Sequence, residues 1–191
     1  MEAFFNEVSK FVSLSDVSKK ALAAILIPDN FHKGQCVLRP NSVCNNVYFV
    51  ESGLLRTFYE KDEKDVTDWL SPENTFSCSI LSFVNRIPDR RGIEALEDSK
   101  VWGVQFYELN NLYDLHHDIE RLGRMLYGLG VTLVQQRFDN LHFNSALERY
   151  TQLMNTNPTL IQRTPLSMIA TYLGITQETL SRIRSQYPFH A

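Results

Sequence analysis

The chain has 191 residues, 43% of them hydrophobic, and a formal net charge of −3. These values allow a sizeable core in one large domain or two small ones, and they exclude a disordered chain. The charge is uneven, because residues 142–191 carry four arginines and two glutamates, whereas the remainder has a net charge of about −5. A mildly basic end on an acidic body is typical of a modular DNA-binding protein, although the basic charge is small.

The cysteines exclude two further classes of protein. Cys36, Cys44 and Cys78 lie far apart and form no C-x-x-C pair, so we expect buried free thiols and neither a disulfide framework nor a metal site.

The longest apolar run, residues 21–27, is too short to cross a membrane, and Glu2 and Glu7 lie where a signal peptide would have basic residues. We therefore expect a cytoplasmic protein without a membrane partner.

The first part of the chain predicts helices and then strands. Residues 1–27 have apolar positions at helical spacing, with a break near residues 13–16, and predict two short helices, the second capped by Ser15 and ended by Pro28. From Phe31 to about Val104 the period becomes that of strands, punctuated by turn signals and by a short helix near residues 80–85. Short strands at this spacing predict an antiparallel sandwich or barrel.

A short helix at residues 107–112 and a long one from Asp118 to about Leu141 follow. Apolar side chains form a stripe along the long helix at approximately coiled-coil spacing, and it continues to Phe138 and Leu141. The dimer contact is predicted at Ile119, Leu122, Leu126, Leu129 and Leu133. Because a helix that joins two domains has no obvious core of its own, pairing with a second copy would bury this stripe. The alternative is a single helix packed on its own sandwich.

Residues 142–163 predict the next helix, which leads to the segment TPLSMIATYLGITQETLSRIRSQ at residues 164–186. Ala170 is small enough for two helices to approach, Gly174 tolerates a left-handed turn, and the apolar residues lie on the facing sides. We expect Thr164 to cap the first helix and Thr176 to cap the second. The segment is typical of a helix-turn-helix that reads DNA, and the alternative is a helical hairpin without a DNA contact.

The order of these elements resembles the Crp/Fnr family of bacterial transcription regulators across nearly the whole chain. The phrase Val47-Tyr48-Phe49-Val50-x-x-Gly53 is similar to the cyclic nucleotide-binding-like β-roll, and residues 173–183 resemble the recognition motif. The resemblance implies an α+β protein with an N-terminal antiparallel, jelly-roll-like sensor domain at 1–112, a dimerisation helix at 113–141 and a helix-turn-helix domain at 142–191. It also implies a homodimer that reads an inverted repeat in double-stranded DNA, with RNA polymerase as a further partner.

Matched residue by residue, the resemblance assigns roles on the second helix of the motif. Gln177, Glu178 and Arg182 would face base edges, with Arg182 on guanine and Gln177 on adenine. Phosphate contacts would come from Thr176, Thr179, Ser181 and Arg184. An alternative for Arg182 is a surface ion pair with Glu178, four residues earlier.

The sensor half departs from the family pattern. Members that bind nucleotides hold the ribose with a glutamate shortly after a phenylalanine, and the phosphate with an arginine followed by a small hydroxyl residue. In this chain Phe76 precedes Ser77-Cys78-Ser79, and Arg90 precedes Arg91. We therefore expect no cyclic nucleotide cofactor, and an effector of unknown type at Phe76, Cys78, Ser79, Arg90 and Arg91, unless the two arginines are merely solvated loop charges.

Two further expectations concern function. Only five residues follow Gln186, too few for the β-hairpin wing that commonly follows the recognition helix. No nucleophile motif, phosphate loop or metal cluster stands out, so we expect no enzyme. The sequence leaves two functions open, a DNA-binding regulator and a small-molecule sensor whose helix-turn-helix contacts another protein.

Overall fold

The structure is a computed structural model that describes residues 1–186. Its strands form two antiparallel sheets, which confirms the predicted α+β class with a jelly-roll-like N-terminal part. The first sheet has the order β1 (Leu26–Phe31), β8 (Ser99–Gln105), β3 (Asn46–Ser52) and β6 (Phe76–Ser77). The second has the order β2 (Cys36–Leu38), β7 (Gly92–Ala95), β4 (Leu55–Lys61) and β5 (Lys64–Ser71).

The helices lie before, within and after the sheets. Two precede them, α1 (Glu2–Ser9) and α2 (Asp16–Ile25), and one, α3 (Ile80–Asn85), interrupts them. After the sheets come α4 (Phe106–Leu115), α5 (His117–Phe143), α6 (Ala146–Thr156), α7 (Pro158–Arg163), α8 (Leu166–Tyr172) and α9 (Gln177–Gln186). The predicted helices at 80–85, 107–112 and 118–141 are therefore confirmed, each within a few residues of its expected ends.

The N-terminal helices are confirmed, but the strand after them was missed. Ser15 caps α2, because its hydroxyl accepts a hydrogen bond of 3.1 Å from the Ser18 amide. Pro28 does not mark the start of a loop, since it lies within β1 and pairs with Trp102 of β8. β1 is an edge strand, and a proline is tolerated there because one side of an edge strand has no partner to bond.

The space between the two sheets is filled by apolar side chains. A cluster of Phe31, Tyr48, Val50, Leu55, Ile93, Ala95 and Val101 forms this core. Gly53 makes the turn between β3 and β4 with φ of +100°, and a Cβ added there would lie 2.3 Å from Ser99 Oγ. A turn this tight requires glycine.

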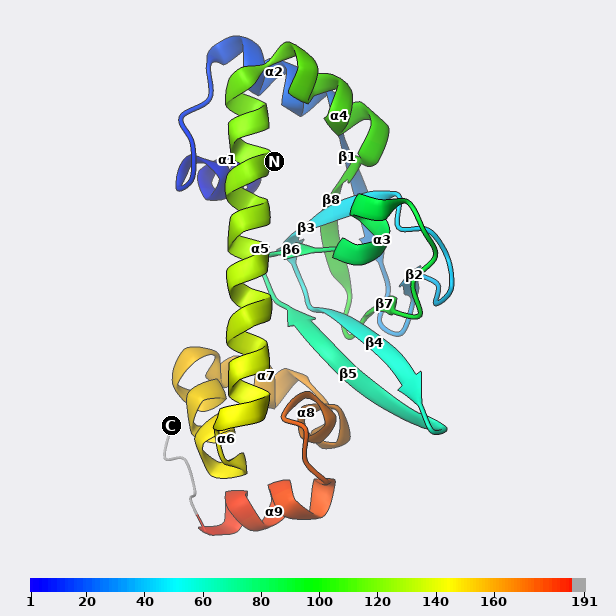
Figure 1. The fold of residues 1–191 in the computed structure, drawn as a ribbon, viewed down its shortest axis with the longest axis vertical. Helices are drawn as coiled ribbons and strands as arrows, with labels where there is room; N and C mark the ends of the chain where they lie inside the picture. Colours follow the sequence, from blue (N-terminus) through cyan, green and yellow to red (C-terminus); the bar gives the residue numbers. More distant parts are fainter. Residues whose placement is uncertain (187–191) are drawn as a thin grey trace.

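Helix α5 runs along one side of the molecule and joins its two ends (Figure 1). Its first turns pack beside α4 and α2, and its last turns reach the C-terminal helices. Asp118 fixes the beginning of α5 to the beginning of α2, since it accepts hydrogen bonds from the Ser15 amide at 2.8 Å and the Ser18 hydroxyl at 2.5 Å.

The segment before the helix-turn-helix differs from the prediction in two ways. Residues 142–163 form two helices, because Pro158 begins α7 at its first position. Thr164 does not cap α8, since Pro165 occupies the cap position and the Thr164 hydroxyl has no hydrogen-bond partner among the described residues. Thr164 instead ends α7, and its extended backbone carries the chain into α8.

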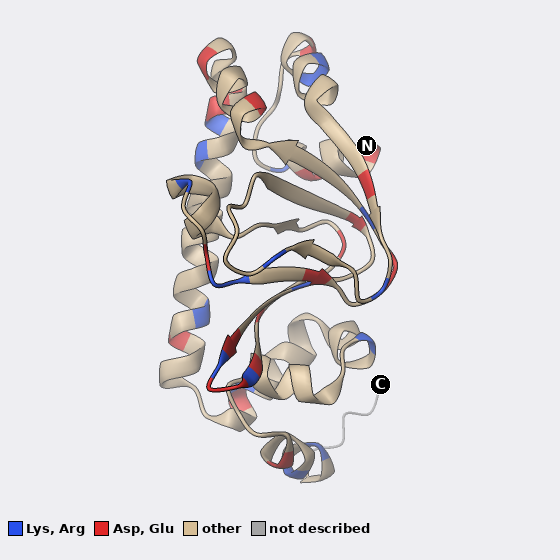
Figure 2. Cartoon of the chain, turned by 90° about the vertical axis from the view of Figure 1, so that its right-hand side faces the viewer, with Lys and Arg blue, Asp and Glu red and all other residues tan. Residues whose placement is uncertain are grey.

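The C-terminal helices share a hydrophobic core with the end of the roll. Leu54, Leu70 and Leu96 belong to the same buried cluster as residues of α6 to α9. Arg163 adds a polar tie, donating to Glu73 at 2.7 and 2.9 Å and also contacting Glu97. In Figure 2 these helices lie directly below the sheets. The domain boundaries after residues 112 and 141 stay predictions.

Candidate nucleic-acid interface and sensor region

The two helices of the predicted motif are present, joined by a tight turn. Gly174 has φ of +65°, and a Cβ added to it would lie 3.0 Å from Leu141 at the end of α5. Both the left-handed backbone and the close approach therefore favour glycine. Ala170, 1% exposed, lies in the cluster on which α9 packs through Leu180 and Ile183. The buried side of α9 is thus fixed against the rest of the protein.

The other side of α9 faces away from the body of the protein. Gln177, Glu178, Ser181, Arg182 and Arg184 are all exposed. Figures 1 and 2 show α9 at the end of the molecule opposite α2, with charged positions of both signs along it. An amide, a hydroxyl and two guanidinium groups on one accessible helix face have the chemistry that base edges and phosphates require.

Some of these side chains already have partners within the helix. Arg182 forms an ion pair with Glu178, so the alternative contact is present, but both side chains are more than 70% exposed. An exposed pair of this kind contributes little, so it can open for a better partner at small cost. The Thr176 hydroxyl caps α9 by accepting from the Thr179 amide at 3.1 Å, and the two hydroxyls are 2.9 Å apart. Their assignment to phosphate stays a prediction.

The long helix α5 divides into two parts. Ile119 and Leu122 are buried in the core formed with α1 and α2, so no partner helix can reach them, and their assignment to a dimer contact was wrong. Leu126 packs at the edge of the same core, Leu133 is half-buried and Leu129 is 38% exposed. For its first turns, the alternative of a helix packed on its own domain holds.

A second apolar stripe on α5 is exposed. It has alternating steps of four and three residues, which is the spacing of a coiled-coil contact. Its members are Tyr127, Val131, Val134, Phe138 and Leu141, between 38% and 71% exposed. We call this set the exposed stripe. The sequence stripe already contained Phe138 and Leu141, but the predicted dimer contact followed its leucines and left out Tyr127, Val131 and Val134.

The predicted effector residues do not form one open site. Phe76 is partly buried and packs against the hydrophobic core, with its ring centroid 5.4 Å from that of Phe49. Burial raises the pKa of the Cys78 thiol to about 12. Arg90 is exposed, as the loop-charge alternative expects. The structure brings together only Ser79 and Arg91, and it does so through a residue that the sequence did not indicate.

That residue is Asp89, which is 4% exposed. Its carboxylate accepts a hydrogen bond of 2.5 Å from Ser79 Oγ and lies 3.3 Å from the Arg91 guanidinium, which also binds Asp68 at 2.6 Å. Burial raises the pKa of Asp89, but the Ser79 hydroxyl and the Arg91 charge outweigh it, and the net result is a pKa below the ordinary value. The Ser79 hydroxyl and the Arg91 guanidinium are therefore already bonded to the protein's own Asp89 carboxylate.

A second buried charge, Arg56, also escaped the prediction. It lies on β4, 1% exposed, and donates to Glu94 at 2.6 Å and Thr67 at 3.0 Å, with Asp65 as a further partner. The neighbouring residue Leu70 joins the core of the C-terminal helices, and the Thr67 amide bonds the Thr171 hydroxyl of α8 at 3.0 Å. Arg56 is therefore buried on the sheet face that α8 covers. The sequence feature that could have indicated this burial is an arginine that lies among the apolar residues of a strand.

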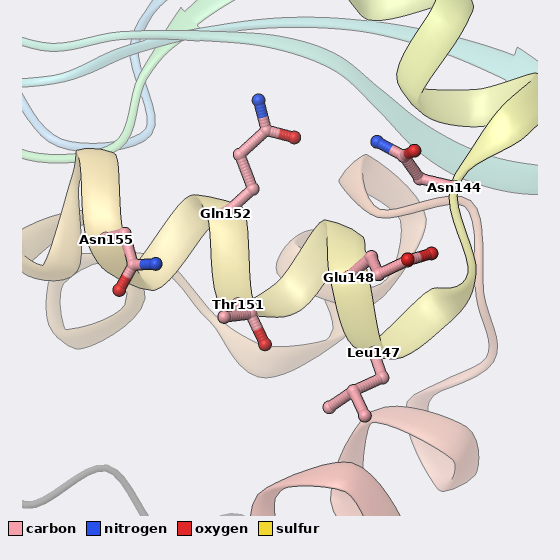
Figure 3. A pocket seen from close by; sticks show the side chains of 6 residues that line it. All are labelled: Asn144, Leu147, Glu148, Thr151, Gln152 and Asn155. Carbon is pink, nitrogen blue, oxygen red and sulfur yellow. The ribbon is translucent and has the colours of Figure 1, made fainter.

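A surface hollow lies elsewhere, on α6. Asn144, Leu147, Glu148, Thr151, Gln152 and Asn155 line it, and the side chains spread outward from the helix in Figure 3. It contains none of the predicted effector residues, and most of its lining is exposed. Such a surface encloses a small molecule poorly.

Two findings apply to residues 1–186. No helix in this range is both long and apolar enough for a membrane span. Within the same range, no three His, Cys, Asp or Glu side chains gather as metal ligands would.

Comparisons with known proteins agree with this architecture. Residues 28–116 match the family model of the cyclic nucleotide-binding domain. A cAMP-dependent protein kinase regulatory subunit from Debaryomyces hansenii is 31% identical over 96 residues, which are 50% of this chain and 20% of that protein. The chain thus spans about a fifth of that relative.

Solved structures resemble the chain over most of its length. FixK2 from Bradyrhizobium japonicum superposes with a TM-score of 0.70 and 20% identity, covering 85% of this chain and 84% of that one. A transcriptional regulator of the Crp/Fnr family from Eubacterium rectale gives the same TM-score and identity, covering 91% and 83%. Residues 28–116 are therefore similar to a cyclic nucleotide-binding domain, and the chain as a whole has the fold of the Crp/Fnr transcription regulators.

Proposed function

We propose that the protein is a DNA-binding transcription regulator that acts as a homodimer. The observation that carries this proposal is the exposed polar face of α9, held outward by a capped turn and a buried apolar side. A helix presented in this way enters the major groove without rearrangement of the protein. The likeness in fold to Crp/Fnr regulators supports the proposal.

The bases would be read by three side chains of α9. Arg182 would leave Glu178 to bind guanine O6 and N7, since the ion pair is solvent-exposed and weak. Gln177 has the amide that suits adenine, and Glu178 would accept from cytosine. Arg184 would bind phosphate, helped by the hydroxyl of Ser181.

Dimerisation would follow the exposed stripe of α5. Two copies packed along it would bury five large side chains, from Tyr127 to Leu141, that water now contacts. A twofold axis along α5 would present the two α9 helices to successive major grooves, with half-sites about 34–36 Å apart. The operator would therefore be an inverted repeat.

The sensor would respond to something other than a cyclic nucleotide. The residues after Phe76 lack the glutamate that nucleotide-binding members have there, and the Asp89 carboxylate is already bonded to Ser79 and Arg91. A phosphate entering this site would have to displace a buried carboxylate. We place the regulator in the cytoplasm, with RNA polymerase as a further partner.

Selection of bound duplexes from a random DNA pool with the purified protein tests the proposal. We expect an inverted repeat with half-sites one helical turn apart. Recovery of no enriched sequence at low salt would contradict it. Titration with cAMP in a thermal-shift assay tests the sensor part, where we expect no change in melting temperature.

The second candidate is a sensor whose helix-turn-helix binds another protein. The ion pair between Arg182 and Glu178 favours it, because it reduces the free positive charge on a region of already small net charge. Salt distinguishes the two functions, since DNA affinity falls steeply as salt rises and an apolar protein contact does not.

A further inference from the structure

The C-terminal end of α8 leaves two backbone carbonyls without helical partners. The amides of Leu173, Gly174 and Ile175 bond the carbonyls of Ile169, Thr171 and Ala170. Tyr172 O and Leu173 O lie beyond these bonds, at the negative end of the helix dipole. Such carbonyls need donors, and a cation is the favoured one.

Two arginines from different helices supply the donors. Arg137 of α5 donates through Nη2 to Tyr172 O, and its guanidinium carbon lies 4.1 Å from the centroid of the Tyr172 ring. Arg149 of α6 donates through Nε to Leu173 O at 2.8 Å and through Nη1 to Asn144 O at 2.5 Å. We call Arg137 and Arg149 the arginine clamp.

The clamp holds the backbone at the point where the chain turns toward α9. Gly174 follows the two carbonyls directly, and α9 begins three residues later. Arg137 itself lies on α5 one residue before Phe138 of the exposed stripe. Arg137 therefore connects the helix of the proposed dimer contact to the turn before the proposed reading helix, and Arg149 connects α6 to the same turn.

The environment of Arg137 indicates a specific role. Burial lowers the pKa of its guanidinium, with Arg149 adding to this effect, while Tyr172, Asp68 and Tyr59 oppose it. Its Nε has no partner among residues 1–186. A partly buried guanidinium with one nitrogen unpaired contributes little to stability, so this arginine is better explained by the positions of the groups that it bonds.

We propose that Arg137 and Arg149 are positioning residues that set the direction of α9 relative to α5, and with it the half-site spacing that the dimer accepts. Neither side chain would touch DNA in this role. A lysine at position 137 keeps the charge but loses the planar group that stacks on Tyr172, so it would replace arginine only in part. The inference rests on the proposed function.

The test compares operators that differ only in spacing. Wild type, Arg137→Gln and Arg137→Lys are titrated against the selected inverted repeat, against the same repeat with one base pair inserted between the half-sites, and against a single half-site. We expect wild type to lose about a hundredfold in affinity on insertion, because the second half-site is lost to the dimer. For Arg137→Gln we expect this ratio to fall below about tenfold, with the single half-site bound as before.

Controls separate positioning from folding. Arg121→Gln removes an exposed arginine from the same helix and should keep the wild-type ratio. Arg137→Lys should give an intermediate ratio, and it provides the test if the glutamine variant does not fold. Sedimentation must show a dimer for each protein compared.

The outcomes are distinguishable. If dimeric Arg137→Gln loses as much affinity on insertion of one base pair as wild type does, the clamp is overturned and the regulator proposal stays intact. If the glutamine variant is unfolded, the same result for dimeric Arg137→Lys has the same meaning. A wild-type protein that binds no duplex at low salt overturns both. Loss of half-site affinity in proportion to operator affinity would make the arginine a DNA contact or a folding residue, and would also overturn the clamp.

Discussion

The region around Asp89 and the proposed reading helix α9 carry similar polar side chains, which are bonded and buried in the first and exposed in the second. In the sensor region Ser79, Asp89 and Arg91 are bonded to one another, and Arg56 on β4 is likewise buried with its own partners. On α9 the corresponding groups face water, and the pair that exists there is exposed. Buried and satisfied polar groups specify a structure, whereas accessible ones are available to a ligand.

The same contrast divides α5. Its first turns bury Ile119 and Leu122 in the core of their own subunit, while the exposed stripe that begins at Tyr127 faces water. The molecule thus has a self-contained end and an open end. We infer that binding to DNA and to a second copy takes place at the open end.

The largest expected effect is on the exposed stripe. Val134→Glu combined with Phe138→Glu should produce monomers in sedimentation, because two like charges would be forced together at the dimer contact. Affinity for the full operator should fall by about 10²–10⁴, the gain that comes from linking two half-sites.

The comparison for this variant is Leu129→Glu, which alters an exposed member of the stripe first predicted from the sequence. We expect it to remain dimeric. If Leu129→Glu became monomeric while the Val134→Glu, Phe138→Glu variant stayed dimeric, the dimer contact would lie on the stripe first predicted and not on the exposed stripe.

The next effect tests the buried polar groups. Arg56→Met should lower the free energy of unfolding by about 3 kcal/mol, because it leaves Glu94 and Thr67 without their buried partner. Urea denaturation measures this change. Arg90→Met, at an exposed position, should change stability by less than about 0.5 kcal/mol. If Arg56→Met and Arg90→Met were equally stable, the claim that the buried, paired arginine stabilises the fold more than the exposed one would be refuted.

Arg182 tests the open end. Arg182→Ala should weaken binding to the selected operator by about 1–3 kcal/mol and relax the base preference at one position of each half-site. Arg184→Ala should instead weaken all sequences alike, since phosphate contacts carry no sequence information. An unchanged preference in Arg182→Ala, measured by competition between duplexes, would refute the base-reading role.

The smallest effect is the pH dependence of Asp118. Burial raises the pKa of this carboxyl, but hydrogen bonds from Ser15, Ser18 and the Ile119 amide outweigh it and lower the pKa to about 2. Since the folded pKa lies below the unfolded value of about 3.9, the stabilisation is complete above pH 4 and is lost as the pH falls toward 2.

Unfolding by urea at several pH values measures it. Wild type should exceed Asp118→Asn in stability at pH 6, and the difference should shrink between pH 4 and pH 2. A difference that does not depend on pH would show that these bonds do not distinguish the ionised carboxylate.

Local patterns were sufficient to predict most elements. Turn residues separated the strands, and the spacing around Gly174 indicated the two helices of the motif. β1 was missed because Pro28 normally ends an element, and only the position of β1 at a sheet edge permits it. The Thr164 cap was wrong because α7 extends to Arg163 and occupies the chain just before it.

Contacts between distant residues were beyond the sequence pattern. Periodicity found an apolar stripe on α5, but it could not show that Ile119 would be covered by α1 and α2. Arg56 was within a correctly predicted strand, yet its burial depends on α8, more than a hundred residues later. Asp89 could not be predicted as buried because a single acidic residue in a loop is ordinarily solvated.

The most direct test of the central claim is the salt dependence of binding to the selected duplex. If α9 is an accessible reading helix, log Kd should change with log salt concentration with a slope of magnitude about 2, from the two phosphate-binding Arg184 side chains of a dimer. In Arg184→Ala the magnitude of this slope should be smaller by about 2, because each subunit loses one phosphate contact. A protein with no measurable duplex affinity at 50 mM salt, or with affinity that salt does not change, would contradict the account.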